Sequence, residues 1–151
     1  MTDTIARFAT LFGIGRAPYA PGTAASFAAL LVAIPVEYFL GANALFALAI
    51  ATALFGVWVA GAYEEETGRE DPKECVIDEA AGQWLACAFA PLSPVGYALA
   101  FLLFRLFDIA KPWPVSSAEK LPGGTGIVAD DMVAGLIAGV VIYLFAQSGF
   151  L

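Results

Sequence analysis

Two adjacent carboxylates, Asp78 and Glu79, directly precede a long apolar segment at residues 80–104. A second adjacent pair, Asp130 and Asp131, precedes another apolar segment. Charged groups beside apolar segments are costly unless a partner neutralises them. Carboxylate oxygens are the ligands that Mg²⁺ prefers, shared with water and substrate phosphate. The two pairs therefore predict a magnesium site, although acids favoured by the dipole at helix N-termini are an alternative explanation.

Two cations and two further acids accompany these pairs. Arg105 and Asp108 are three residues apart, so on a helix they share a face and could simply pair with each other. Lys111 follows one turn later, and Asp71 lies in an acidic loop at residues 63–78. Together they indicate extra metal ligands and positive charge for a phosphoryl group.

A loop rich in glycine and proline at residues 13–23 leads into an apolar segment. Thr23 is the predicted N-cap of the following helix, and Ser26 lies one turn further on. Free N–H groups at a helix start, together with hydroxyls, suit phosphate. Simple capping of a membrane helix explains the same residues, and both explanations stay open.

Absent residue types narrow the mechanism. The chain contains no histidine, which excludes phosphohistidine intermediates and histidine bases. Neither Cys75 nor Cys87 has arginine at the spacing of cysteine phosphatases, and no phosphoaspartyl Asp-x-Asp motif or P-loop occurs. A metal-bound water, or an aspartate acting as base or nucleophile, remains as the source of attack on phosphorus.

The composition is that of a membrane protein. Hydrophobic residues make up 60% of the 151 residues and charged residues only 14%, against about 25% charged residues in typical soluble domains. The net charge of −7 argues against a nucleic-acid partner, because such partners bind basic surfaces. The N-terminus lacks a basic region followed by an apolar stretch, so no signal peptide is expected.

Apolar segments define the predicted helices. Residues 24–40, 44–62 and 132–149 are long enough to be spanning candidates, and residues 4–14 predict a short interfacial helix. Two prolines interrupt the segment at 80–104, which favours two short helices that enter and leave on the same side.

The basic residues predict the topology. All seven lie in or beside residues 1–23, 63–78 and 105–131, which places these segments in the cytoplasm. We therefore expect an all-α polytopic membrane bundle of about four to five transmembrane or re-entrant helices, with its polar loops gathered on the cytoplasmic face. The range 1–151 is expected to be a single domain.

The chemistry-bearing residues resemble the phosphatidylglycerophosphatase A family. The resemblance covers nearly the whole chain, and it departs at Ala25, where that family favours glycine. It rests on four blocks in order: Gly13-x-Gly15 through Ala20-Pro21-Gly22-Thr23 with Ser26; Asp71-Pro72 with Val76-Ile77-Asp78-Glu79-x-x-Gly82; Phe104-Arg105-x-Phe107-Asp108-Ile109-x-Lys111-Pro112-x-Pro114; and Gly124-x-Gly126 with Asp130-Asp131-x-x-Ala134-Gly135.

The resemblance implies magnesium-dependent removal of the terminal phosphate of phosphatidylglycerophosphate, a membrane phospholipid, at the cytoplasmic side of a bacterial inner membrane. The metal ligands it implies are Asp78, Glu79, Asp130 and Asp131, with Asp71. Phosphate would be held by Arg105 and Lys111 with Thr23, Ser26 and Arg16. The implied catalytic set is Asp78, Glu79, Asp108, Asp131 and Lys111.

Two alternatives belong to other functional classes. A small cation-binding membrane transporter would use Glu37, an acid inside the first apolar segment, together with carboxylates at several membrane depths. A lipid phosphotransferase would carry acids spaced along one helix, which this chain lacks. The phosphatase hypothesis instead predicts that the carboxylates gather at one face.

Overall fold

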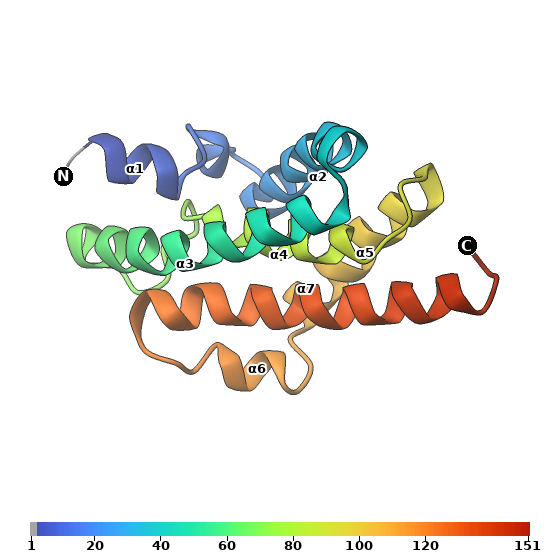
Figure 1. Ribbon diagram of the computed structural model, residues 1–151. Coiled ribbons are helices and arrows are strands. Elements are labelled where there is room, and N and C mark those ends of the chain that lie inside the picture. The colour runs from blue at the N-terminus through green and yellow to red at the C-terminus, as the bar shows by residue number, and fades with distance from the viewer. Residues whose placement is uncertain (1–2) are drawn as a thin grey trace.

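The computed structural model describes residues 3–151, and within that range every regular element is a helix (Figure 1). The elements are α1 (Asp3–Ala9), the 3₁₀ turn η1 (Ile14–Arg16), α2 (Pro21–Leu40), α3 (Ala42–Thr67), α4 (Ile77–Ala88), α5 (Pro94–Ala110), α6 (Val115–Ala118) and α7 (Gly123–Gln147). The predicted all-α fold class is confirmed.

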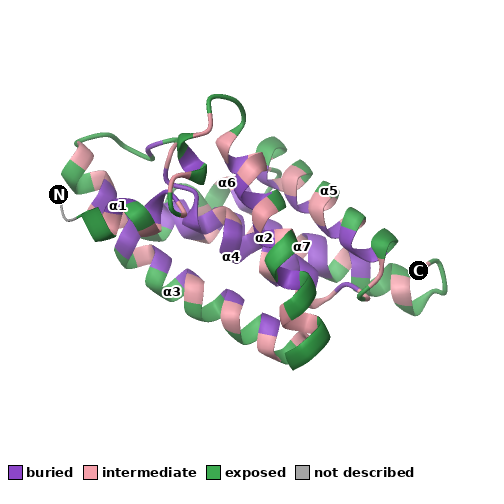
Figure 2. Cartoon of the chain, turned by 90° about the horizontal axis from the view of Figure 1, so that it is seen from above, coloured by how far each residue is buried: buried purple, intermediate pink, exposed green. Residues whose placement is uncertain are grey.

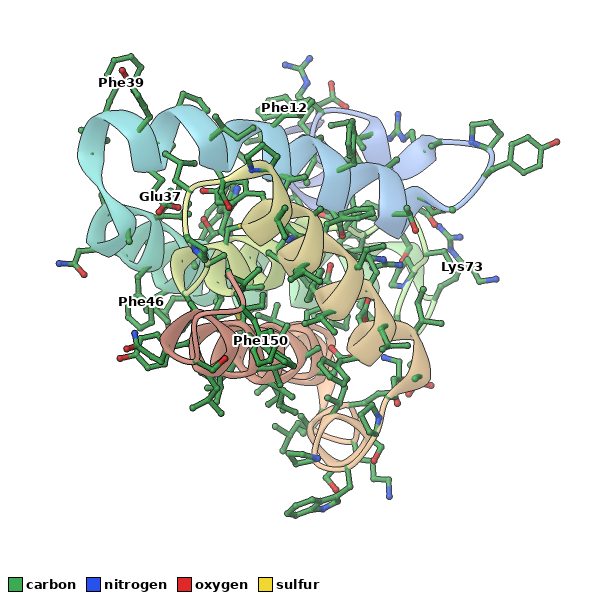
Figure 3. The ribbon with its side chains drawn as sticks, turned by 90° about the vertical axis from the view of Figure 1, so that its right-hand side faces the viewer. Phe12, Glu37, Phe39, Phe46, Lys73 and Phe150 are labelled. Atoms are coloured by element: carbon green, nitrogen blue, oxygen red, sulfur yellow. The ribbon has the colours of Figure 1, made fainter. Side chains whose placement is uncertain are left out.

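The two longest helices, α3 and α7, lie side by side and run in opposite directions (Figure 1). Helix α2 crosses both helices at a steep angle. Figure 3 looks along α7 and shows α2 lengthwise. The short helix α4 lies in the middle and packs against α2, α3, α5 and α7. Nine of its 12 residues are buried, which makes α4 the centre of the structure (Figure 2).

Helix α4 owes its central position to small side chains. Alanines at positions 80, 81 and 86 and Gly82 let neighbouring helices approach its backbone closely. Trp84 ties α4 to α2, since its indole N–H donates to the Ala29 carbonyl at 2.8 Å. Around α4, Phe104 of α5 and Ile142 of α7 are fully buried.

Three helices are long and apolar enough to cross a membrane by length and composition: α2, α3 and α7. At 1.5 Å per residue, the 20 residues of α2 extend about 30 Å, which is the thickness of the hydrocarbon core. Many large apolar side chains on these helices are exposed, including Leu31, Leu54 and Leu144. Such a surface suits lipid.

The segment at 80–104 forms two helices, α4 and α5, as expected. The break follows from a cap and a proline: Gly96 N donates to the Ser93 side-chain oxygen at 3.0 Å, and Pro94 occupies the first turn of α5. Proline is favoured there because its missing N–H would have had no partner. With 12 residues, α4 is too short to cross a bilayer, whereas α5 has 17 residues.

The predicted N-cap at Thr23 is wrong. Helix α2 begins at Pro21, its N-cap is Ala20, and Thr23 lies within the first turn. Proline at the start of the helix presets the helical φ angle, so the helix begins two residues before the hydroxyl. Helix α3 similarly continues to Thr67, where Gly68 in the left-handed conformation ends it.

The glycine cluster at residues 123–126 is helical, although its composition is typical of a flexible loop. Helix α7 begins at Gly123, so Asp130 and Asp131 lie two turns inside it. The glycines serve packing: a Cβ on Gly124 would clash with the Val57 carbonyl of α3, and one on Gly126 with the Leu121 carbonyl. Close backbone contact, with α3 at Gly124 and with the turn before α7 at Gly126, explains these two glycines.

Candidate active site

A cavity of about 260 Å³ lies where five segments meet. The start of α2, the loop before α4, the start of α4, the end of α5 and the third turn of α7 all contribute. Its lining residues include Gly22, Asp71, Lys73, Asp78, Glu79, Arg105, Asp108, Lys111, Asp130 and Asp131. Residues up to 111 positions apart in sequence, Ala20 and Asp131, thus share one cavity.

Five carboxylates form two overlapping groups in this cavity. Within each group, one oxygen per residue lies within 4.8 Å of the others, and Asp131 belongs to both groups. The groups are Asp78, Asp130 and Asp131, and Glu79, Asp108 and Asp131. Opposite ligands of one Mg²⁺ ion are about 4.2 Å apart. The spacing therefore approaches that of a divalent-cation site.

Two glycines bring the carboxylates of α4 and α7 together. Gly82 follows Asp78 by four residues, and Gly135 follows Asp131 by four, so each lies one turn beyond its carboxylate. A Cβ on Gly82 would lie 2.6 Å from the Asp131 carbonyl oxygen, and a Cβ on Gly135 would clash with the Gly82 carbonyl. The helices cross in backbone contact, which places Asp78 beside Asp131.

Two cations only partly neutralise the acids. Arg105 pairs with Asp108, and the Lys111 ammonium lies 2.5 Å from Asp130 and 3.3 Å from Glu119. Burial disfavours charge on Lys111, but its hydrogen bond to Asp130 and the nearby acids outweigh burial and raise its pKa. Lys111 therefore stays protonated at neutral pH.

Three carboxylate oxygens in the cavity are buried and accept no hydrogen bond from residues 3–151: Asp78 Oδ1, Glu79 Oε2 and Asp131 Oδ2. Burial raises the pKa of Asp78 well above its usual value, and the neighbouring Glu79 and Asp131 charges add to the effect. Buried oxygens without donors are costly. These residues therefore fit a divalent cation, which would satisfy the oxygens and offset their repulsion.

The anion side of the cavity is formed by α2 and α5. Arg105 Nε is buried and has no acceptor among the described residues. A Cβ on Gly22 would lie 3.1 Å from one Arg105 terminal nitrogen and 2.5 Å from Glu79 Oε1. Only glycine lets the start of α2 approach this pair. An unsatisfied guanidinium N–H beside a helix N-terminus suits a phosphate group.

Comparison with known proteins agrees with this geometry. The sequence model of the family described as "Phosphatidylglycerophosphatase A" matches residues 7–146. The chain belongs to the phosphatidylglycerophosphatase A family. It is a phosphatase, which is a phosphoric monoester hydrolase, and its three apolar helices and bacterial relatives indicate a bacterial membrane protein.

Three curated relatives are similar to most of the chain. A Bacteroides thetaiotaomicron protein provisionally named a phosphatidylinositol-3-phosphatase is 37% identical over 140 residues, 88% of this chain and 87% of the relative. Proteins named phosphatidylglycerophosphatase A from Escherichia coli and Haemophilus influenzae are 33% and 34% identical, covering 90% and 87% of this chain and 80% and 82% of themselves. No solved structure matches the chain.

Some residues predicted from the family resemblance lie apart from the cavity. Ser26 is fully buried, and its hydroxyl donates to the Gly22 carbonyl at 2.9 Å. Arg16 lines a different cavity with Arg7, and Thr23 is absent from the lining. Asp71 lines the cavity but belongs to neither carboxylate group. Glu37 lies outside the site, hydrogen-bonded to Tyr97 at 2.5 Å.

Sequence reasoning missed two participants. Glu119 pairs with Lys111 from a neighbouring cavity that Asp71 and Asp130 also line, and no motif marked it. Gly22 was part of a family block, but only its distance from Glu79 and Arg105 shows why glycine is needed. Cys75 also lines the cavity, and burial raises the pKa of its thiol to about 12. It stays protonated at neutral pH, which argues against a cysteine nucleophile.

The substitution Gly22→Ala should lower kcat/KM about 100-fold. The added methyl group would push Arg105 and Glu79 from their positions, and small displacements of catalytic groups greatly slow a reaction. Gly61→Ala is the matched control, since its Cβ would meet its nearest atom, Gly124 N, at 3.5 Å. Phosphate release by both variants tests this. Equal activity of the two would contradict the role of Gly22.

Proposed function

We propose that the chain hydrolyses phosphatidylglycerophosphate to phosphatidylglycerol and phosphate in a magnesium-dependent reaction, with residues 1–151 acting as one membrane-embedded domain. The observation that carries the proposal is the juxtaposition of buried, unsatisfied carboxylate oxygens with a buried, unsatisfied arginine N–H in one cavity. Acids suit a cation and the arginine suits a phosphate, so the cavity favours a metal-dependent phosphomonoesterase.

We assign the metal ligands to four carboxylates: Asp78, Glu79, Asp130 and Asp131. When bound, Mg²⁺ supplies positive charge that polarises the phosphoryl group and neutralises the acids. Asp71 lies at the cavity wall, where it can act through water.

The remaining roles belong to the cations and to one carboxylate acting as base. Arg105 and Lys111 bind the phosphoryl oxygens and stabilise the charge that develops there. A carboxylate of the cluster, with Asp108 as one candidate, takes a proton from the attacking water. The water oxygen bonds to phosphorus, the bond from phosphorus to the headgroup oxygen breaks, and that oxygen receives a proton to give the alcohol.

We place the cavity on the cytoplasmic side of the bacterial inner membrane. Helix α1, the end of α3 and the start of α7 lie at one end of the molecule, whereas the start of α5 and the C-terminus lie toward the other (Figure 1). The basic residues belong to the segments at the first end and around the cavity. The positive-inside tendency supports this orientation.

A phosphatidylinositol phosphate is the second candidate substrate. It is favoured by the Bacteroides relative, which has 37% identity and whose provisional name specifies a phosphatidylinositol-3-phosphatase. Both candidates carry a phosphorylated polyol on a phosphatidyl lipid, so the same cation and arginine would meet either phosphate.

Purified protein in detergent should release phosphate from phosphatidylglycerophosphate with Mg²⁺ and should lose this activity in chelator. Parallel reactions with phosphatidylinositol 3-phosphate compare kcat/KM for the two lipids. Higher kcat/KM for the inositol lipid would reassign the substrate. Inactivity toward both lipids with Mg²⁺ would overturn the proposed function.

Metal binding should also appear without turnover. Because only the folded chain holds the carboxylates together, Mg²⁺ at 100 times its dissociation constant should stabilise the fold by about 2.7 kcal/mol. The midpoint of thermal unfolding in detergent, measured with Mg²⁺ and with chelator, tests this. An unchanged midpoint across a magnesium titration would contradict the assigned site.

A further inference from the structure

Two aromatic side chains beside the cavity are almost completely exposed. Tyr19 is 87% exposed and Trp113 is 80% exposed, the highest values among the large apolar residues. Each lies between prolines, in Pro18-Tyr19-Ala20-Pro21 and Pro112-Trp113-Pro114. Proline restricts the backbone before folding, so presenting these rings requires little further ordering.

The two rings belong to loops that border the candidate active site on different sides. Tyr19 directly precedes Ala20, Pro21 and Gly22, which line the cavity at the start of α2. Trp113 follows Lys111, which lines the cavity at the end of α5. Each of these two loops therefore carries one exposed aromatic ring within two residues of the cavity lining.

The chemistry of the rings identifies their partner. Tyrosine and tryptophan concentrate where headgroups meet acyl chains, because the ring is apolar and its polar atom remains hydrated. Tyr19 directly precedes α2, a helix apolar enough to span a bilayer. Lys73, which lines the same cavity, lies near this end of α2, whereas Glu37 and Phe39 lie toward the other end (Figure 3). The exposed Lys73 can pair with an anionic headgroup there.

We propose that Tyr19 and Trp113 insert into the headgroup region of the bilayer that carries the substrate and hold the cavity at the depth of the lipid phosphates. A phosphorylated lipid then enters sideways between the two loops without leaving the membrane. The two residues are positioning residues. Their kinetic effect rests on the proposed function, but their insertion does not.

Insertion is tested by the depth at which bromine-labelled lipids quench Trp113 fluorescence. The protein carries Trp58→Phe and Trp84→Phe, which leaves Trp113 as the single tryptophan, and is reconstituted in phosphatidylcholine and phosphatidylglycerol vesicles. Bromine at the headgroup end of the acyl chain should quench more strongly than bromine at its methyl end. Absence of quenching at any depth, or strongest quenching at the methyl end, would overturn the proposal.

The kinetic test compares a lipid substrate in vesicles with a short-chain, water-soluble analogue. The double variant Tyr19→Ala/Trp113→Ala should raise KM for the vesicle substrate about tenfold. A tenfold change corresponds to the loss of about 1.4 kcal/mol of binding free energy at the interface. We expect kcat, and both constants for the soluble analogue, to stay within about twofold. Tyr19→Trp/Trp113→Phe should restore KM.

Phe39→Ala provides the matched control, because Phe39 is 77% exposed at the end of α2 away from the cavity. It should leave KM for the vesicle substrate unchanged. An equal rise in KM for Phe39→Ala would mean a general structural effect and would overturn the proposal. An equal loss of activity of the double variant on the vesicle substrate and on the soluble analogue would overturn it too. If no variant turns over either substrate while quenching shows insertion, the proposed function fails and the insertion stands.

Discussion

Asp131→Asn should lower kcat/KM at least about 1,000-fold, equivalent to about 4 kcal/mol of transition-state stabilisation. Asp131 is the one residue common to both carboxylate groups, and its Oδ2 is buried without a donor among the described residues. An amide of the same shape removes a negative ligand from both groups. Phosphate release with saturating Mg²⁺ measures the loss.

The same variant separates a binding defect from a folding defect. Removing one of several repelling charges should leave the thermal midpoint in chelator unchanged or higher, while stabilisation by Mg²⁺ is largely lost. Glu65→Gln is the control, because Glu65 is an exposed acid near the end of α3. A normal magnesium-induced shift in Asp131→Asn, or activity near that of Glu65→Gln, would remove Asp131 from the assigned site.

Gly135→Ala should destabilise the fold by about 3 kcal/mol and abolish activity. The new methyl would collide with the Gly82 carbonyl, which is backbone and cannot move aside as a flexible side chain could. Separating α4 from α7 also moves Asp78 from Asp131. Thermal unfolding in detergent and phosphate release measure the two effects.

Gly56→Ala is the matched control for this prediction. A Cβ on Gly56 would meet Val128 at 3.5 Å and Ile77 at 3.6 Å, which are ordinary contacts. Alanine also favours the helical state, so this variant should be as stable as wild type or more stable by up to about 1 kcal/mol. If Gly135→Ala is as stable and as active as Gly56→Ala, backbone contact does not control the crossing of α4 and α7.

Much of the architecture follows from sequence alone. Apolar length predicts α2, α3 and α7, because a bilayer requires about 20 residues per helix. Pro91 and Pro94 predict the division of residues 80–104 into α4 and α5. The family blocks identify the carboxylates that gather in the cavity. These features depend on local composition, which a single sequence displays.

Helix boundaries are less predictable because packing changes the role of a residue. Glycines at 123–126 have a composition typical of a loop, yet they are helical since α3 lies too close for a Cβ at Gly124. Ser26 has the chemistry of a phosphate ligand, yet burial turns its hydroxyl to the Gly22 carbonyl. Local propensity cannot reveal which neighbour a helix will meet.

The sequence by itself determined the helical class, the membrane character and the identity of the acids and cations. Only the tertiary structure decided their arrangement. Asp78 and Asp131 meet because Gly82 and Gly135 allow two backbones to touch one turn beyond them. Like charges on these carboxylates would separate if each helix were free. The packed glycine crossing of α4 and α7 holds Asp78 beside Asp131, the residue common to the two groups of three carboxylates.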